Sequence, residues 1–391
     1  MIKENVSLEK QLQQLIQQFA ETASERDKQG GTAKAQRDLL RNSRLLSLMI
    51  PEQYGGYGKN WKTAFHFTRE IAKVDSSVAH LFGYHFLCLF SVELYGTQQQ
   101  VANYLKETAA NNYFWGNAFN PLDTHVCATK SDTGWTINGK KSFCSGATDS
   151  DRLLISAQKD DGSGVVIAVI PSNRAGVVIE DDWDSFGQRQ TDSGSVYFEA
   201  VQVLDEEVLD AFQADDNNVF ASMRTHIAQS ILIHVLLGTA EGAFEAAIQY
   251  TQQSTRPWLT ANVERAVDDP YHMHNYGALL VKLKAAQALA KESNALIQET
   301  WDYKHNITLQ QRGDCSIAVA TTKIQVVETA LEVTNRMFQM MGARATSAKY
   351  NFDRYWRNVR THSLHDPIDY KIRDIGKFIL TNQYPDITAY S

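Results

Sequence analysis

The segment RNVRTHSLHDPIDYK, from Arg357 to Lys371, concentrates groups that can move protons or donate hydrogen bonds. Its two histidines lie three residues apart and supply imidazoles, which gain or lose a proton near neutral pH. Asp366 follows the second histidine, and Pro367 restricts this aspartate to an extended backbone. We therefore interpret the segment as a candidate site of acid–base or hydrogen-bond chemistry.

A metal centre is a second interpretation of closely spaced histidines. The motifs HMH at 272–274 and HSLH at 362–365 could each offer two ligands. Neither has an acidic or cysteine ligand set beside it at a familiar spacing. The four cysteines lie far apart, at Cys88, Cys127, Cys144 and Cys315, and no CxxC pair occurs. This spacing argues against both a zinc cluster and a disulfide framework. We expect no metal.

Composition limits the classes of protein to which the chain can belong. Its 391 residues exceed the usual size of one core, and 43% hydrophobic content can fill two or three packed units. A net charge of −7 without a long basic block predicts no binding to nucleic acid or an anionic membrane. We see no apolar run approaching the roughly 20 residues of a membrane span. The N-terminus MIKENVSLEK does not resemble a signal peptide, so we expect a cytoplasmic protein.

The elements that position the histidines follow from periodicity. Apolar residues recur at helical spacing in the first third of the chain, at 8–19, 34–48, 61–74, 77–95 and 98–111. Short β-type runs begin at Tyr113, and Asn138-Gly139 within GWTINGKKSFCS predicts a hairpin turn. The helical period returns after Val208, and a four-helix bundle is predicted from 217–253, 277–303, 310–341 and 366–380. We predict a mainly α fold with a central β domain, divided at 1–112, 113–210 and 211–391.

The order of these pieces resembles the acyl-CoA dehydrogenase superfamily over essentially the whole chain. IPEQYGGYG resembles that family's IPxxYGGxG turn, FNPLDT lies where the family has its TEPxAGS-type loop, and SFCSGA takes the place of its WITNA stretch. The resemblance implies an N-terminal helical bundle, a middle β-barrel or sandwich, and a C-terminal four-helix bundle. It also implies a flavin where the β domain meets the second bundle.

The resemblance assigns residues to the flavin ring. Phe143 takes the aromatic place and Ser145 the hydroxyl place of the Trp-Ile-Thr segment, and residues at i and i+2 of a strand point to one side. Asn120 is expected at the flavin edge, and Trp183 is expected as an aromatic wall. The alternative is that Phe143 is a core residue and Ser145 a turn residue.

Two arginines bear on which flavin is bound. In FQMMGARATS, Arg344 replaces a glycine of the turn that in the family passes the adenosine half of FAD. Arg256, in QQSTRPW, matches the family's phosphate-binding arginine. A guanidinium binds a terminal phosphate bidentately, so the pair favours FMN over FAD. Surface ion pairing is the alternative for either arginine alone.

The opening segment departs from the dehydrogenases. Their glutamate base aligns with Asp366, which is one methylene shorter and precedes Pro367. The pattern RTHxLHDPxxYK instead resembles the two-component, reduced-flavin-dependent monooxygenases, such as dibenzothiophene monooxygenase and the sulfur-acquisition and alkanesulfinate monooxygenases. In that branch a second histidine comes from a YHF context, which here is His85. A lone histidine on an apolar helix is otherwise most often a satisfied core residue.

This branch implies an enzyme that uses FMNH2 and O2 to form a flavin C4a-hydroperoxide and oxygenates a small organosulfur compound of sulfinate, sulfone or thiophene type. His85 and His365 would donate hydrogen bonds, Asp366 would orient an imidazole, and Ser145 would hold the flavin. The substrate pocket is expected from Tyr84, Phe86, Phe90 and Phe119. A separate NAD(P)H-dependent reductase and a homotetramer are implied.

Two other classes of function remain open at this stage. An FAD-dependent acyl-CoA dehydrogenase would use Asp366 as its base, and a non-catalytic helical scaffold would retain only the fold. The residues also do not decide between sulfur, carbon and nitrogen as the oxygenated atom.

Overall fold

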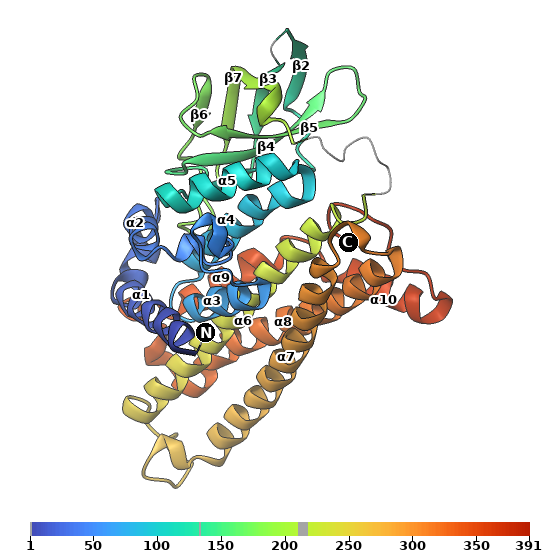
Figure 1. Cartoon of the computed structure of the whole chain (residues 1–391). Helices are drawn as coiled ribbons and strands as arrows, with labels where there is room; N and C mark the ends of the chain where they lie inside the picture. The colour runs from blue at the N-terminus through green and yellow to red at the C-terminus, as the bar shows by residue number, and fades with distance from the viewer. Residues whose placement is uncertain (1, 133, 210–217) are drawn as a thin grey trace.

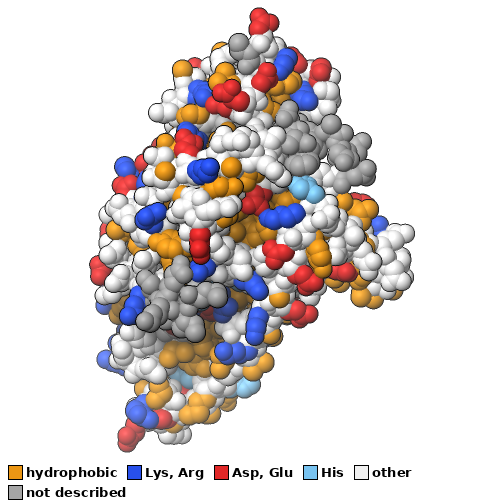
Figure 2. Space-filling model, viewed as in Figure 1, with side chains coloured by type: hydrophobic (Ala, Val, Ile, Leu, Met, Phe, Trp, Pro, Cys, Tyr) orange, Lys and Arg blue, Asp and Glu red, His pale blue; other side chains and the backbone are white. Residues whose placement is uncertain are grey.

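The computed structural model describes residues 2–132, 134–209 and 218–391, with side chains from Leu8 onward. A β domain lies at one end of an elongated helical body, and the long C-terminal helices extend away from it (Figure 1). On the face seen in Figure 2, Lys and Arg side chains are interspersed with Asp and Glu side chains, without a continuous basic band.

Five helices form the N-terminal part of the chain: α1 (Ile2–Gln29), α2 (Lys34–Ser43), α3 (Trp61–Ala72), α4 (Ser76–Tyr95) and α5 (Gln98–Asn111). Side-chain caps fix where three of them begin, because Asn60, Asp75 and Thr97 accept backbone hydrogen bonds at the starts of α3, α4 and α5. α4 is buried on nearly every face and packs against α3, α6 and β1. It therefore runs through the centre of the molecule.

The β domain is one seven-stranded sheet formed by β1 (Trp115–Ala118), β2 (Cys127–Ser131), β3 (Gly134–Lys141), β4 (Arg152–Lys159), β5 (Val165–Pro171), β6 (Val177–Ile179) and β7 (Val196–Leu204). The strand order is β1-β4-β2-β3-β7-β6, and β5 pairs with β4. β1 runs parallel to β4 next to α4, which brings the end of β1 to the helical body.

The predicted hairpin at Asn138-Gly139 is wrong. These residues lie inside the continuous strand β3, and the turn lies one strand earlier, between β2 and β3, where Ser131 pairs with Gly134. At Asn138-Gly139 the register against β7 shifts, and a Cβ on Gly139 would meet the His125 carbonyl oxygen at 2.1 Å. Gly139 therefore lies in a β-bulge where two backbone segments approach closely. An Asn-Gly pair is typical of such a bulge as well as of a tight turn.

The C-terminal part contains α6 (Met223–Gln253), α7 (Pro270–Asp302), α8 (Leu309–Met341), α9 (Asp353–Ser363) and α10 (Ile368–Thr381). α8 packs along α6 and α7, α9 packs on α6 and α8, and α10 packs on α8. Periodicity missed α9 because its sequence is mostly polar; its inner face is Tyr355, Val359 and His362. The predicted domain boundary at 210 and 211 lies outside the described residues.

Two helices bear on the expectation about membrane spans. α4 and α6 are long and apolar enough to cross a bilayer by length and composition, contrary to the expectation from the sequence. Most of their residues are buried inside the protein, as in core helices. Their apolar character is therefore explained by packing.

Candidate active site

A cluster of imidazoles lies between the N-terminal half of α4 and the end of α9. His80 and Tyr84 are one helical turn apart on α4, with ring centroids 4.1 Å apart, and the His362 ring lies 4.8 Å from that of His80. Both nitrogens of His80 and Nδ1 of His362 are buried without a hydrogen-bond partner among the described residues. Buried polar atoms are normally paired, so these nitrogens are suited to hold a bound group or water.

Burial keeps this cluster uncharged. It lowers the pKa of His80 to about 3, with the charge of His365 as a second cause, and it lowers the pKa of His362 well below the ordinary value. At neutral pH each of these rings therefore carries one N–H donor and one lone pair.

His365 is fixed by a carboxylate that is itself fixed by two lysines. His365 Nδ1 lies 3.1 Å from Asp366 Oδ1. Lys323 of α8 is fully buried and donates to the same oxygen, and the Lys371 ammonium lies 2.9 Å from Oδ2. Burial alone would raise the pKa of Asp366, but His365, Lys323 and Lys371 together hold it well below its ordinary value. Asp366 is therefore an anchored anion that orients the ring of His365 and is poorly placed to act as a free base.

The opposite wall comes from the β domain. Ser145 Oγ lies 2.8 Å from Ser193 Oγ, which in turn lies 2.8 Å from Thr191 Oγ1. Phe143 is 61% exposed and adopts a positive φ of 56°, and its ring centroid is 6.1 Å from that of Trp183. The exposed Phe143 and the partly buried Trp183, beside a chain of hydroxyls, fit the face and edge of a flavin ring.

The loop after Trp183 joins this wall to the histidines. Trp183 Nε1 donates to the Gln188 carbonyl at 2.8 Å, and the Gln188 N–H donates to Asn358 Oδ1 at 2.6 Å. Gln188 Nε2 donates to Ser76 Oγ at 2.5 Å. Because Ser76 and Asn358 each lie one turn before a cluster histidine, the loop holds the aromatic wall next to His80 and His362.

The predicted second histidine, His85, is not brought to this cluster. Its Nε2 pairs with the Leu46 carbonyl at 2.8 Å, and its Nδ1 accepts from the Trp115 N–H at 3.2 Å. Both nitrogens are used by buried backbone, and burial lowers the pKa of the ring to about 4. His80, and not His85, lies at the histidine cluster where the second histidine was expected. The signal that could have found His80 is the i, i+4 pair with Tyr84 on the face of α4 toward the β domain.

The predicted pocket residues separate in the same way. Tyr84 belongs to the cluster, and Phe119 lies under the guanidinium of Arg224 with 3.9 Å from Cζ to ring centroid. Phe86 packs in the core against Phe82, and Phe90 packs in the core against Trp61. They point away from Tyr84, so they stabilise α4 and do not line the site.

Asn120 caps its own loop. Its Oδ1 accepts from the Leu122 N–H at 3.2 Å, and the loop is fastened by Asp123, which accepts from the Ser142 N–H at 2.8 Å. Asn117, which was not predicted, reaches further into the site, because its N–H donates to the Ser145 carbonyl and its Oδ1 accepts from Arg224.

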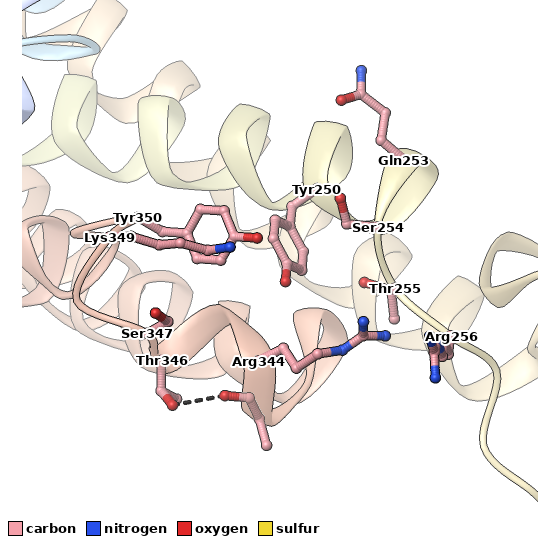
Figure 3. A pocket seen from close by; sticks show the side chains of 11 residues that line it. Tyr250, Gln253, Ser254, Thr255, Arg256, Arg344, Thr346, Ser347, Lys349 and Tyr350 are labelled. Carbon is pink, nitrogen blue, oxygen red and sulfur yellow. Dashed lines mark hydrogen bonds between the residues drawn. The ribbon is translucent and has the colours of Figure 1, made fainter.

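The two predicted arginines meet in a separate cavity of about 770 Å³ (Figure 3). It is lined by Tyr250, Gln253, Ser254, Thr255, Arg256, Ala343, Arg344, Thr346, Ser347, Lys349 and Tyr350. Three cations with several hydroxyls form a donor set suited to a phosphate dianion.

This arginine cavity is remote from the histidines of the same chain. It lies at the C-terminal end of α6, which Figure 1 shows at the far end of the molecule from the β domain. Thr239 of α6 donates to Ser76, one turn before His80, and stands 14 residues before Gln253, about 21 Å along the axis. Gln229, which bonds to Lys323 beside Asp366, stands 24 residues before Gln253. The cavity is therefore several helical turns away from the histidines of the same chain.

Three models of the acyl-CoA dehydrogenase family match the chain: the N-terminal domain at residues 3–112, the middle domain at 116–201 and the C-terminal domain at 230–370. The chain belongs to the acyl-CoA dehydrogenase family. The predicted fold, helical bundle, β domain and helical bundle, is confirmed.

Within the family, the similar proteins are monooxygenases. The probable FMNH2-dependent monooxygenase SfnC of Pseudomonas putida is 44% identical, with 97% of this chain and 96% of that protein covered. Dibenzothiophene monooxygenase of Rhodococcus erythropolis is 43% identical, with 95% and 92% covered. Glutaryl-CoA dehydrogenase of Desulfococcus multivorans is only 23% identical, with 80% of this chain and 79% of that protein covered. The predicted branch is therefore confirmed, and the dehydrogenases are distant.

Solved structures agree. Methanesulfinate monooxygenase MsuC from Pseudomonas fluorescens superimposes with a TM-score of 0.95 at 44% identity, covering 98% of this chain and 99% of that one. FMN-bound TdsC from Paenibacillus sp. A11-2 superimposes with a TM-score of 0.94 at 42% identity, again covering 98% and 99%.

Proposed function

We propose that this protein is an FMNH2-dependent monooxygenase that oxygenates a small organosulfur compound of sulfinate, sulfone or thiophene type. A separate NAD(P)H-dependent reductase would supply the reduced flavin in the cytoplasm. The observation that carries the proposal is the buried, uncharged pair His80 and His362 beside His365, while Asp366, which aligns with the dehydrogenase base, is held by Lys323 and Lys371. The names of the similar proteins, monooxygenases of methanesulfinate and dibenzothiophene, support it.

The residues present fit a flavin. Phe143 and Trp183 offer an aromatic face, Ser145 a hydroxyl and the arginine cavity a phosphate site. When bound, reduced FMN supplies two electrons and activates O2; one oxygen atom enters the product and the other leaves as water.

The chain's own residues then position the reactants. His80 and His362 supply N–H donors from a site that excludes bulk water, and His365, oriented through Nδ1 by Asp366, directs Nε2 at the oxygen being transferred. Because these rings are neutral at pH 7, they donate hydrogen bonds without acting as strong acids.

We further propose a homotetramer in which one subunit's arginine cavity binds the phosphate of a flavin whose ring lies at another subunit's histidines. Support comes from the distance between the two groups along α6. Large apolar side chains also lie exposed beside the cavity, where a second copy could cover them: Trp258 is 74% exposed, Leu259 91% and Tyr271 78%.

The test is oxygenation under ¹⁸O2 with an FMN reductase, NADH and a panel of sulfinates, sulfones and thiophenes. We expect one ¹⁸O atom per product molecule and, without substrate, release of hydrogen peroxide. Oxidation of an acyl-CoA without oxygen incorporation would contradict the proposal and favour the dehydrogenase alternative.

A further inference from the structure

Arg224, the second residue of α6, contacts α4 and the β domain through Ser91, Asn117 and Phe119. Its guanidinium lies over the Phe119 ring, its Nε donates to Ser91 Oγ at 3.1 Å, and its Nη2 donates to Asn117 Oδ1 at 3.3 Å. All three contacts are with neutral groups. They fix the plane of the guanidinium, and they leave Nη1 without a hydrogen-bond partner and unburied among the residues that the structure describes.

Among the residues that the structure describes, no side chain balances the charge of Arg224. Across 8–132, 134–209 and 218–391, no carboxylate lies within ion-pair distance of it. Six other partly or fully buried arginines pair with an Asp or Glu: Arg26, Arg37, Arg69, Arg152, Arg174 and Arg357. Arg312 and Arg354 are exceptions, because their contacts are with carbonyl and hydroxyl oxygens. A partly buried cation without a counter-charge is costly unless a ligand supplies one.

Arg224 and the catalytic histidines share a neighbour in Tyr84. Burial raises the pKa of Tyr84, and among the charges around it Arg224 has the largest effect and opposes that rise, whereas Asp366 and Tyr390 add to it. The Tyr84 ring also stacks on His80. A small group held by Nη1 would therefore lie beside Tyr84, between Arg224 and the ring of His365.

The nearby groups leave this positive charge in place. The anionic Asp366 is already neutralised by Lys323 and Lys371, and His80 and His362 are uncharged at neutral pH. Phe119 and Cys88, which contact Arg224 and Asn117, add no charge to this surrounding. A neutral sulfone or thiophene has no charge to offer Arg224, whereas a sulfinate carries two equivalent anionic oxygens that match a guanidinium edge.

We propose that Arg224 binds the oxyanion of a small alkanesulfinate and so selects anionic over neutral organosulfur substrates. This rests on the proposed monooxygenase function. The reaction is RSO2⁻ + O2 + FMNH2 → RSO3⁻ + FMN + H2O: a new S–O bond forms, the O–O bond breaks, sulfur and the reduced flavin each give two electrons, and the flavin's two hydrogens leave in water. With its oxygens on Arg224, the sulfinate turns its sulfur lone pair toward the oxygen held by His365.

The experiment compares wild type with Arg224→Gln and Arg224→Lys, using Lys130→Gln as a control. Lys130 is an exposed lysine on β2, far from the site, so its loss changes net charge by the same amount. Two readouts are taken: kcat/KM for methanesulfinate and for dimethyl sulfone with FMN reductase and NADH, and the thermal shift caused by methanesulfonate. The second readout needs no turnover, and saturating FMN keeps the sulfonate out of the arginine cavity.

We expect Arg224→Gln to lower kcat/KM for methanesulfinate about 10- to 100-fold, the usual effect of losing a charge-assisted hydrogen bond. The thermal shift caused by methanesulfonate should vanish in Arg224→Gln. Arg224→Lys should keep part of the methanesulfinate activity and part of the thermal shift. Lys130→Gln should match wild type in both readouts. The thermal midpoint of Arg224→Gln without ligand, taken in the same measurement, shows whether the variant is folded.

Equal losses for methanesulfinate and dimethyl sulfone, or an unchanged methanesulfonate shift in Arg224→Gln, would overturn the role of Arg224. Wild type that oxygenates only neutral compounds would overturn it too. If wild type oxygenates no sulfur compound at all, the proposed function fails, and the sulfonate shift with its dependence on Arg224 still decides the anion site.

Discussion

His80 and His85 stand on the same helix but have opposite surroundings. Replacing His85 by Phe leaves the Trp115 N–H and the Leu46 carbonyl buried without partners, so the free energy of unfolding should fall by about 2 to 4 kcal/mol. Replacing His80 by Phe leaves no protein group without a hydrogen-bond partner, so the free energy of unfolding should be nearly unchanged. The same change should increase the share of O2 that is released as hydrogen peroxide. Urea unfolding and the ratio of product to peroxide measure both effects. The reverse pattern would restore His85 as the catalytic residue.

His365→Ala should reduce oxygenation about 10²- to 10⁴-fold, the usual range for a lost acid or hydrogen-bond donor. FMN binding should change little, because the residues proposed to bind its phosphate are remote from His365. The missing product should reappear as hydrogen peroxide. His66→Ala is the matched control, since His66 is 47% exposed in its side chain and pairs with Glu9 away from the site. A large loss of FMN affinity in His365→Ala would assign the residue to flavin binding.

Motifs in the sequence located part of the site. Ser145, Trp183 and His365 follow from the order of family-like stretches, and the similar proteins bear out the monooxygenase branch and FMN. His80 could not be chosen over His85, because α4 is buried on nearly every face and only tertiary packing decides which histidine meets α9 and which meets β1. Arg224 and Lys323 were missed because their partners, Asn117 and Asp366, lie on other elements far away in the chain.

At the scale of elements, α8 and the start of α10 meet through the pair Lys323 and Asp366. Burial, opposed by the attraction of Asp366, lowers the pKa of Lys323 to about 8. Lys323→Met leaves Asp366 to Lys371 and His365, and should cost about 3 kcal/mol or more. Adding Asp366→Leu should recover part of that stability, because both members of the buried pair are then removed and Lys371 keeps its hydrogen bond to the Tyr390 carbonyl. Urea unfolding of the four proteins gives the coupling, and simple addition of the two losses would show that the residues do not interact.

The long helices were predicted better than the turns, bulges and short polar segments that connect the elements. The long periodic helix α8 was found nearly at its true ends and α6 at its C-terminal end, although α6 begins at Met223 and was predicted from 217. The polar helix α9 was not predicted as an element. The error at Asn138-Gly139 has the same origin. A bulge and a turn both require a flexible backbone, and only the pairing with β7 distinguishes them.

At the scale of the whole molecule, several histidines are buried with lowered pKa values: His80, His85, His226, His234 and His362. Below about pH 6.5 the unfolded chain binds a proton at each, and the folded chain does not. The free energy of unfolding should therefore fall with pH from 6.5 downward, by up to about 1.4 kcal/mol per pH unit for each histidine. Urea unfolding at pH 7, 6 and 5 measures the slope, and His226→Phe should reduce it by one proton. Stability independent of pH over this range would contradict the prediction.

The flavin should stabilise the assembled protein according to its phosphate. FMN should raise the thermal midpoint more than FAD, by the equivalent of about 2.7 kcal/mol at a hundredfold excess over Kd. Arg344→Ala should abolish the difference between the FMN and FAD shifts. Arg265→Ala is the control and should keep the difference, because Arg265 is an exposed arginine paired with Asp268. An FAD shift that equals the FMN shift and persists in Arg344→Ala would refute the phosphate role.

The long separation of the arginine cavity from the histidines along α6 also has a genetic consequence. If each flavin is shared between two subunits, a chain without Arg344 and a chain without His365 are damaged in different halves of the site. Two alleles, each inactive alone, should then complement each other when expressed in the same cell, because mixed assemblies place an intact cavity opposite an intact histidine cluster.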